Sequence, residues 1–218
     1  MNDLYLLGIN KVNIKYAVVL LFLVPLLTRG YLGSTFLNSL FTIRLKGSSY
    51  SFLFMLSIRV ISISILFYAL YYMESDLYGT RFISIVFLFI ASMLLLIGSG
   101  SLFTMFIGWD GLGITSYLLV AYYLNYKSIN SGMVTILSNR VGDAMFVLLI
   151  AVVIYSMRFY LSLLLVMVAI TKSAQYPYSA WLPLAISAPT PVRALVHSST
   201  LVTAGVYLLI TYSDRYNT

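Results

Sequence analysis

The sequence predicts an all-α polytopic membrane protein, folded as a bundle of about seven or eight transmembrane helices. Of its 218 residues, 61% are hydrophobic and only 9% are charged, and the mean hydropathy is +0.97. This composition lies far outside that of soluble globular domains. Because a spanning helix needs about 20 largely apolar residues, the chain has room for this bundle in one membrane domain without a soluble lobe.

Apolar runs divided by short polar stretches predict the elements in order. Residues 1–49 hold one or two N-terminal membrane segments and lack the pattern of a cleavable targeting peptide. Residues 50–218 form the main transmembrane module, whose short connections favour antiparallel neighbours. The spans predicted in this module are Tyr50 to Met73, Phe82 to Ile97, Leu102 to Asn125, Gly132 to Tyr155, Phe159 to Tyr176 and Pro191 to Tyr212.

The residue types exclude several classes of function. The net charge of +7 comes from basic residues scattered singly, without the basic clusters that mark nucleic-acid binding. The absence of cysteine removes disulfides, thiolate metal sites and iron–sulfur clusters, and a single histidine disfavours a multi-histidine metal or haem site. We therefore expect no cofactor, no metal and no catalytic residue in this chain, and any redox chemistry lies in a partner.

Ionisable side chains inside the predicted spans are the candidate functional residues. A Lys, Arg or Asp at the centre of a spanning helix costs about 2.5 to 3.5 kcal/mol, and such residues normally face the bundle interior or a wet cavity. These side chains must therefore be partnered or hydrated. In the second half of the chain they are Asp110, Arg140, Asp143, Lys172, Arg193 and His197.

Spacing along the helices relates some of these residues to each other. Arg140 and Asp143 are three residues apart on one helix face and can form an ion pair. A structural pair that fixes helix packing and a part in a proton relay both remain open. Arg193 and His197 are four residues apart, and the arginine opposes protonation of the histidine. Hydroxyls at positions 198–200 can hold chains of water, which favours a relay at His197 over a simple packed histidine.

Lys172 has no acidic residue within four positions on its own helix. Asp110 is the predicted anion for it, because Asp143 already has a local partner. A lysine held between burial and an anion can change protonation with a small rearrangement. The alternative is a lysine that extends to the membrane interface near its helix end.

Two prolines, Pro177 and Pro183, predict a broken helix over about residues 159–187. Irregular backbone at membrane depth is tolerated where protein encloses it or where it lines a water-filled cavity, and transporters place ion sites at such breaks. The lysine and the break therefore indicate an ion or proton pathway rather than a simple membrane anchor.

Four motifs resemble subunit 5 of mitochondrial NADH dehydrogenase, the antiporter-like membrane-arm family of respiratory complex I. The resemblance covers about Tyr50 to Ile210. The motifs are YYMESD at Tyr71 to Asp76, GWDGLGITSYLLVAYY at Gly108 to Tyr123, SNRVGD at Ser138 to Asp143, and TKSAQYPYSAWLPLAISAPTPVRALVHSSTLVTAGVYLL at Thr171 to Leu209.

The resemblance implies a fold of two inverted five-helix repeats, each with one broken helix and one half-channel. This chain holds the first repeat and the helix before it. By resemblance, Lys172 is the titrating residue, Asp110 modulates it, and His197 passes protons laterally toward the second half-channel. The SNRVGD motif supplies the supporting ion pair. The family usually has a small residue at the position of Arg193, which is therefore a modulating residue that opposes transfer through the histidine.

By the same resemblance, the chain is a proton-translocating subunit of NADH:ubiquinone reductase in the mitochondrial inner membrane. Its implied partners are other membrane-arm subunits and membrane lipids, while NADH, FMN, iron–sulfur clusters and ubiquinone belong to the parent complex. Family members are much longer, so we expect an N-terminal half or truncated form, with a separate chain carrying the second half. The alternatives are a subunit of a multisubunit cation/proton antiporter and a non-conducting structural remnant of the membrane arm.

Overall fold

The computed structural model describes residues 49–73, 76, 78–154, 158–184, 189–194 and 201–216. These residues belong to one compact unit, Phe36–Thr218. The N-terminal membrane segments predicted over residues 1–49 lie outside the described residues, except for position 49. They stay a prediction, as does the boundary after that position.

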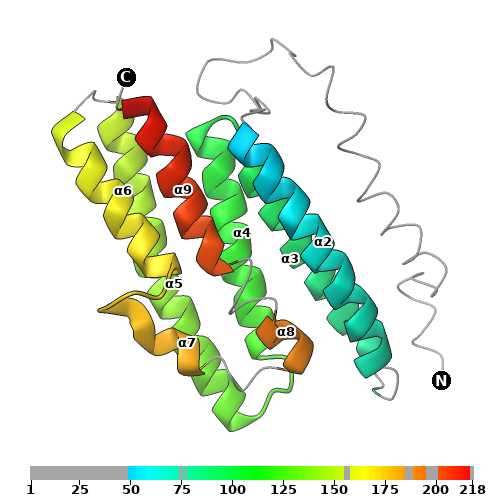
Figure 1. Ribbon diagram of the computed structural model, residues 1–218. Coiled ribbons are helices and arrows are strands. Elements are labelled where there is room, and N and C mark those ends of the chain that lie inside the picture. The colour runs from blue at the N-terminus through cyan, green and yellow to red at the C-terminus, as the bar shows by residue number, and fades with distance from the viewer. Residues whose placement is uncertain are drawn as a thin grey trace. The chain divides into compact units, whose positions relative to one another are not determined.

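The regular elements of the described residues are helices, which confirms the all-α prediction. Figure 1 shows the long helices running side by side, with the short helices α7 and α8 at the same end of the bundle. The helices are α2 (Ser49–Tyr72), α3 (Gly79–Gly98), α4 (Leu102–Val120), α5 (Tyr126–Ile154), α6 (Arg158–Lys172), α7 (Trp181–Leu184), α8 (Thr190–Ala194) and α9 (Leu201–Tyr216), with one 3-10 turn, η2 (Tyr178–Ala180).

Four helices, α2 to α5, are long and apolar enough to cross a membrane among the described residues, and α6 and α9 are shorter apolar helices. The chain is therefore a multi-pass membrane protein. The connection between α4 and α5 differs from the prediction, which placed a turn at residues 126–131. Leu124 adopts a left-handed backbone conformation with φ of 52° and separates the two helices. Helix α5 then begins at Tyr126, and the N–H of Ile129 donates to the carbonyl of Asn125 at 2.9 Å.

Small residues allow α5 and α9 to pack directly against α6. A Cβ atom added to Gly142 of α5 would lie 3.1 Å from the Cβ atom of Thr171. A Cβ atom added to Gly205 of α9 would lie 2.7 Å from the carbonyl oxygen of Ala169. Close backbone approach at small residues is the usual packing of membrane helices, because apolar contacts with lipid and with protein are nearly equivalent there. These contacts fix the C-terminal half of α6, where Lys172 lies.

The predicted broken helix is confirmed, but the break begins earlier than predicted. Helix α6 ends at Lys172 and not at Tyr176. Ala174 adopts a left-handed conformation with φ of 53°, and the N–H of Gln175 donates to the carbonyl of Ile170 at 3.3 Å. This is the Schellman arrangement that ends many helices, and glycine is usual at its left-handed position. The backbone turn at residue 174 therefore stops the helix before the first proline is reached.

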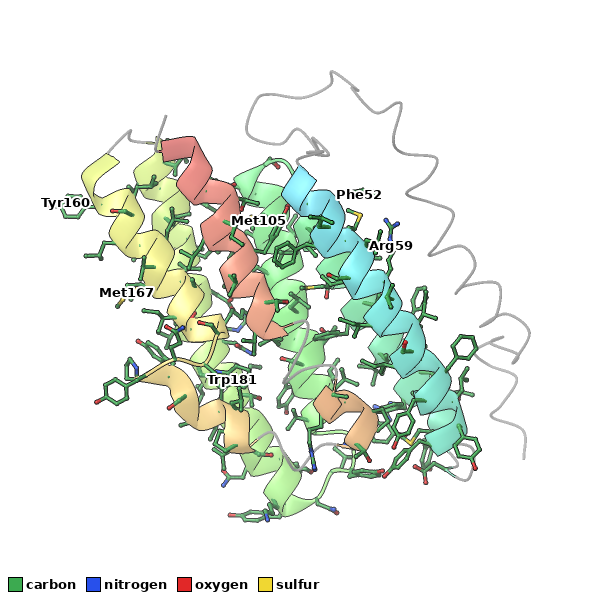
Figure 2. The ribbon with its side chains drawn as sticks, viewed as in Figure 1. Phe52, Arg59, Met105, Tyr160, Met167 and Trp181 are labelled. Carbon is green, nitrogen blue, oxygen red and sulfur yellow. The ribbon has the colours of Figure 1, made fainter. Side chains whose placement is uncertain are left out.

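The two prolines shape the segment after the break. Pro177 follows a cis peptide bond and immediately precedes η2, and Pro183 lies within α7, one residue before that helix ends. Trp181 is buried at the break (Figure 2). Its indole N–H donates to the carbonyl of Thr171 at 3.3 Å, which satisfies one carbonyl that the end of α6 leaves without a helical partner.

Candidate functional site

Lys172 is the last residue of α6 and is completely buried, with 0% of its surface exposed. Its Nζ atom donates to the backbone carbonyl of Trp109 in α4 at 3.3 Å and lies 5.1 Å from the centre of that tryptophan ring. A Cβ atom added to Gly113 would lie 3.4 Å from the same Nζ. The side chain thus reaches inward toward α4, which excludes the alternative of a lysine that extends to the membrane interface.

Arg140 contacts two carboxylates. Its Nη1 lies 3.1 Å from Oδ1 of Asp110 in α4 and 3.7 Å from Oδ2 of Asp143 on its own helix. The predicted contact between Arg140 and Asp143 is present, but the shorter one joins α4 and α5. Arg140 is half exposed, at 53%, whereas the side-chain exposures of Asp110 and Asp143 are 31% and 9%. The guanidinium of Arg140, at the edge of the bundle, therefore pairs with two carboxylates that are buried to different extents.

Within the described residues, both carboxylates form their ion pairs with Arg140 and not with Lys172. The expected pairing of Lys172 with Asp110 therefore stays a prediction. The sequence argument set Asp143 aside because it had a local partner, yet that partner is shared.

Three buried polar atoms on α4 and α5 have no hydrogen-bond partner among the described residues. They are Nε1 of Trp109, Oδ1 of Asn139 and Oδ1 of Asp143. The amide Nδ2 of Asn139 lies 3.9 Å from the point that a Cβ atom of Gly113 would occupy, close to the lysine. A buried polar group left unpaired costs about 1–3 kcal/mol, and ordered water commonly satisfies such groups. This set of donors and acceptors therefore suits bound water.

Trp109 and Asn139 are not among the predicted site residues. Both are uncharged, and only ionisable side chains were followed into the spans. They do lie inside the GWDGLG and SNRVGD motifs, directly beside Asp110 and Arg140. Their neighbourhood was therefore visible in the sequence, while the contact of Trp109 with the lysine is seen only in the folded chain.

Of the remaining predicted site residues, Arg193 lies on α8 and His197 lies outside the described residues. Arg193 is exposed in the last turn of α8. His197 lies outside the described residues, as do its neighbours at 195, 196 and 198–200, so the lateral relay stays a prediction. Within the described ranges, no group of three His, Cys, Asp or Glu residues could hold a metal ion.

The chemistry open to this arrangement is proton exchange. A fully buried ammonium faces a carbonyl and an indole ring, and two acids on α4 and α5 are held by an arginine that is open at the edge of the bundle. A buried lysine favours its charged form when anions are close and its neutral form when they are neutralised by another cation.

The chain is similar in sequence to proteins of one known family. The family described as "NADH:quinone oxidoreductase/Mrp antiporter, TM" matches residues 99–159 and 152–218. Proteins named NADH-ubiquinone oxidoreductase chain 5 from Anopheles quadriannulatus, Anopheles arabiensis and Artemia franciscana are each 49% identical to this chain. The alignments cover 75%, 75% and 71% of this chain and 68%, 47% and 30% of the three relatives, so the chain spans only part of their length.

Proposed function

Since this chain belongs to the NADH:quinone oxidoreductase/Mrp antiporter transmembrane family, we propose that it is a proton-translocating membrane-arm subunit of respiratory complex I. In this proposal it contributes one half-channel, and it couples oxidation of NADH by ubiquinone to proton pumping without holding redox chemistry itself. The proposed location is the mitochondrial inner membrane.

The buried ammonium of Lys172 is the observation that supports this proposal. A cation with 0% exposure, placed where a membrane helix ends, has a large energetic cost unless its charge is balanced. Asp143 and Asp110 provide that balance, and Arg140 competes for both. When Arg140 lies close to the two carboxylates, their negative potential at Lys172 is smaller, and Lys172 releases its proton. When Arg140 moves toward the exposed edge, the acids favour the protonated lysine.

Two further residues complete the proposed pathway. His197 receives the proton and passes it laterally toward a second half-channel. Arg193 lies four residues before it in the sequence and opposes its protonation, so Arg193 modulates this transfer. These roles rest on the family resemblance and on sequence spacing.

The proposal also implies which molecules are partners of this chain. Other membrane-arm subunits and lipids surround this chain, nucleic acid is not a partner, and NADH, FMN, iron–sulfur clusters and ubiquinone bind elsewhere in the parent complex. A separate chain carries the helices of the second half. Measurement of the intact mass of this polypeptide in the purified complex tests that point. A single longer chain that includes those helices would contradict a separate partner chain.

Substitution Lys172→Met in the intact complex tests the function. It removes the titrating group while keeping the side chain long and apolar. We expect electron transfer from NADH to quinone to continue with a lower ratio of protons pumped per electron, measured in sealed vesicles. Leu163→Met is the control, because Leu163 lies on the same helix with 62% exposure. An unchanged ratio in Lys172→Met would favour the non-conducting structural role.

The family description also includes Mrp antiporters. A second candidate function is therefore that of a subunit of a cation/proton antiporter. The names of the relatives favour the respiratory complex. Isolation of the assembly that contains this chain separates the two, since flavin and iron–sulfur clusters accompany it only in the respiratory complex. An assembly without either cofactor would overturn the first proposal.

A further inference from the structure

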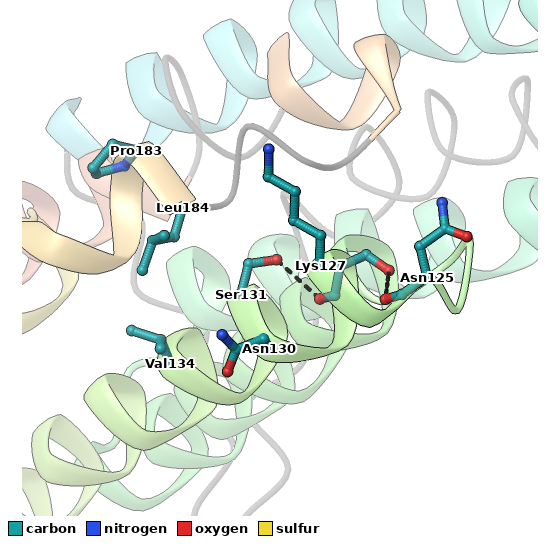
Figure 3. Close-up of a pocket in the computed structure, with 8 residues that line it drawn as sticks. Asn125, Lys127, Asn130, Ser131, Val134, Pro183 and Leu184 are labelled. Atoms are coloured by element: carbon teal, nitrogen blue, oxygen red, sulfur yellow. Dashed lines mark hydrogen bonds between the residues drawn. The ribbon is translucent and has the colours of Figure 1, made fainter.

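The basic residues of the four long helices α2 to α5 occupy two kinds of position. Arg81 is the third residue of α3, and Lys127 is the second residue of α5, where it lines a cavity of about 600 Å³ (Figure 3). A long basic side chain near a helix end can extend its charge to the polar edge of the membrane. Arg140 and Arg59 differ from these two, because each lies near the middle of its helix.

The charge of Arg140 is balanced by the two carboxylates of the candidate site, whereas Arg59 has no carboxylate among the described residues. The Nη2 atom of Arg59 donates to the Sδ atom of Met55, one turn earlier in α2, at 2.9 Å. Its Nε atom is buried and has no hydrogen-bond partner in the described part of the chain. A thioether is a weak and neutral acceptor, so this contact leaves the positive charge unbalanced.

The acidic residues of this chain offer Arg59 no described partner. Of the six acids, Asp110 and Asp143 pair with the arginine of α5, and Asp76 follows the end of α2. That end lies thirteen residues beyond Arg59, or about 20 Å along the helix. The side chains of the other three acids lie outside the described part of the chain: Asp3, Glu74 and Asp214.

The depth of Arg59 argues against a lipid phosphate as its counterion. The residue lies ten positions after the start of α2 at Ser49, which is about 15 Å along the helix from the nearer end. The hydrocarbon core of a bilayer is about 30 Å thick, so a phosphate group also lies about 15 Å from its middle. Basic side chains reach the interface only when they are near helix ends. A carboxylate at the same depth, carried by a protein helix, fits this position better.

The side of α2 that carries Arg59 is turned away from α9. Phe54 packs against Tyr207 of α9, with 5.4 Å between the ring centres. Arg59 follows Phe54 by five residues, a rotation of about 140° around the helix. Figure 2 shows Arg59 on the side of α2 away from α9. Of the four long helices, α2 is also the least covered, with 22% of its most apolar stretch buried.

Apolar side chains beside Arg59 give this side the shape of a helix-packing surface. Phe52, Leu56 and Val60 are each about half exposed and are spaced four residues apart. Met55 and Arg59 form a second row with the same spacing. Rows of this kind are the ridges between which a ridge of another helix packs. We call these five residues the outer face of α2.

We propose that the outer face of α2 is a docking surface for a membrane-spanning helix of a neighbouring subunit, and that this helix carries an Asp or Glu side chain that pairs with Arg59. The first 48 residues of this chain are a poor alternative, because they carry five basic residues and one acid. The inference requires that α2 spans the membrane and does not require proton translocation, so it can fail or hold separately from the proposed function.

The sign of the effect of Arg59→Leu tests the pairing. This change leaves a paired carboxylate alone in the membrane, so we expect the chain to dissociate from the detergent-solubilised assembly at least about tenfold faster. An arginine that faces only lipid would give the opposite result, because its removal takes away an unbalanced charge. Arg59→Lys keeps the charge and should dissociate more slowly than Arg59→Leu. An unchanged or slower dissociation of Arg59→Leu would overturn the proposal.

Arg81→Leu is the matched control for these rates. It makes the same change at an exposed arginine near the start of α3, where the charge can reach the membrane edge. We expect this variant to dissociate at the rate of the unaltered chain. Equal acceleration by Arg81→Leu and Arg59→Leu would show a general effect of lost positive charge and would contradict a pair at Arg59.

Cross-linking identifies the carboxylate. Arg59→Lys supplies an amine that dicyclohexylcarbodiimide, which enters membranes, joins to a carboxylate in direct contact. After treatment of membranes that contain the assembly, mass spectrometry locates the joined peptides. We expect a link to an Asp or Glu within a membrane-spanning helix of another subunit, and no such link in the unaltered chain. A link to Asp3, Glu74 or Asp214 of this chain, a link to a lipid, or no link would each overturn the proposal.

A double variant completes the test. Replacement of the identified acid by leucine should accelerate dissociation as Arg59→Leu does. The two changes together leave neither charge in the membrane, so the double variant should recover most of the normal rate. If the two accelerations multiply instead, the two side chains do not form a pair.

Discussion

Lys172 and Trp109 are joined by a hydrogen bond of 3.3 Å between the lysine Nζ and the tryptophan backbone carbonyl. In an α-helix this carbonyl accepts from the N–H four residues later, which belongs to Gly113. The lysine therefore uses the second lone pair of a carbonyl that is already bonded. A Cβ atom at Gly113 would lie 3.4 Å from Nζ, an ordinary contact distance, so only a side chain larger than a methyl group would crowd the ammonium there.

The first prediction concerns the size of residue 113. Gly113→Ala places one methyl group at an ordinary contact distance, so we expect little change in pumping. Gly113→Val adds branches on the side of the ammonium, and we expect it to displace Lys172 and destabilise the protein by about 1–3 kcal/mol. Thermal unfolding of the solubilised complex and the proton-to-electron ratio check this. Equal behaviour of the two variants would show that the lysine does not depend on this space.

The second prediction concerns the two carboxylates that share Arg140. The contact to Asp110 is 3.1 Å and the contact to Asp143 is 3.7 Å. In double-mutant cycles with Arg140→Gln, we therefore expect a larger coupling for Asp110→Asn than for Asp143→Asn. The half-exposed arginine limits both couplings to about 0.2–1 kcal/mol. Thermal unfolding measures the couplings, and the reverse order would contradict the shared arrangement.

Much of the fold was predictable because each span has a simple apolar signal. The helices α2 to α5 agree with the predicted spans, apart from the ends of α4 and α5. Those ends differ because a turn at Leu124 uses no glycine or proline, and because the polar residues that follow it are helical. Apolar content therefore predicts membrane spans well but predicts the ends of helices poorly.

The site was predictable as a set of charges but not as a set of contacts. Lys172 and the acids stand out because charge is rare in apolar spans. Sequence spacing could pair Arg140 only with a residue on its own helix, so the shorter contact to Asp110 on α4 was missed. Trp109 and Asn139 acquire their role only from the packing of α4, α5 and α6 around one buried ammonium.

The third prediction concerns the turn that ends α6. Ala174 has φ of 53°, a conformation that costs about 1–2 kcal/mol for a residue with a Cβ atom. Ala174→Gly should therefore raise stability by about 1 kcal/mol. Ala169→Gly is the matched control, because this residue lies inside α6, where glycine lowers stability by about 1 kcal/mol. Opposite shifts of the melting temperature are expected, and shifts of the same sign would contradict the proposed cause of the helix end.

The fourth prediction concerns the contact between α5 and α6. A Cβ atom at Gly142 would lie 3.1 Å from the Cβ atom of Thr171, the residue before Lys172. We expect Gly142→Ala to push the helices apart, lower stability by about 1–3 kcal/mol and reduce pumping, because the lysine moves with α6. Thr171→Ala removes the hydroxyl and methyl groups that the new atom meets.

The double variant Gly142→Ala with Thr171→Ala should recover part of the lost stability, since the two changes share one contact and are not additive. The melting temperature reports the packing, and the proton-to-electron ratio reports the position of the lysine. If the two losses simply add, the contact between these residues does not set the spacing of α5 and α6. Recovery of stability without recovery of pumping would instead show that the hydroxyl of Thr171 has a separate role beside Lys172.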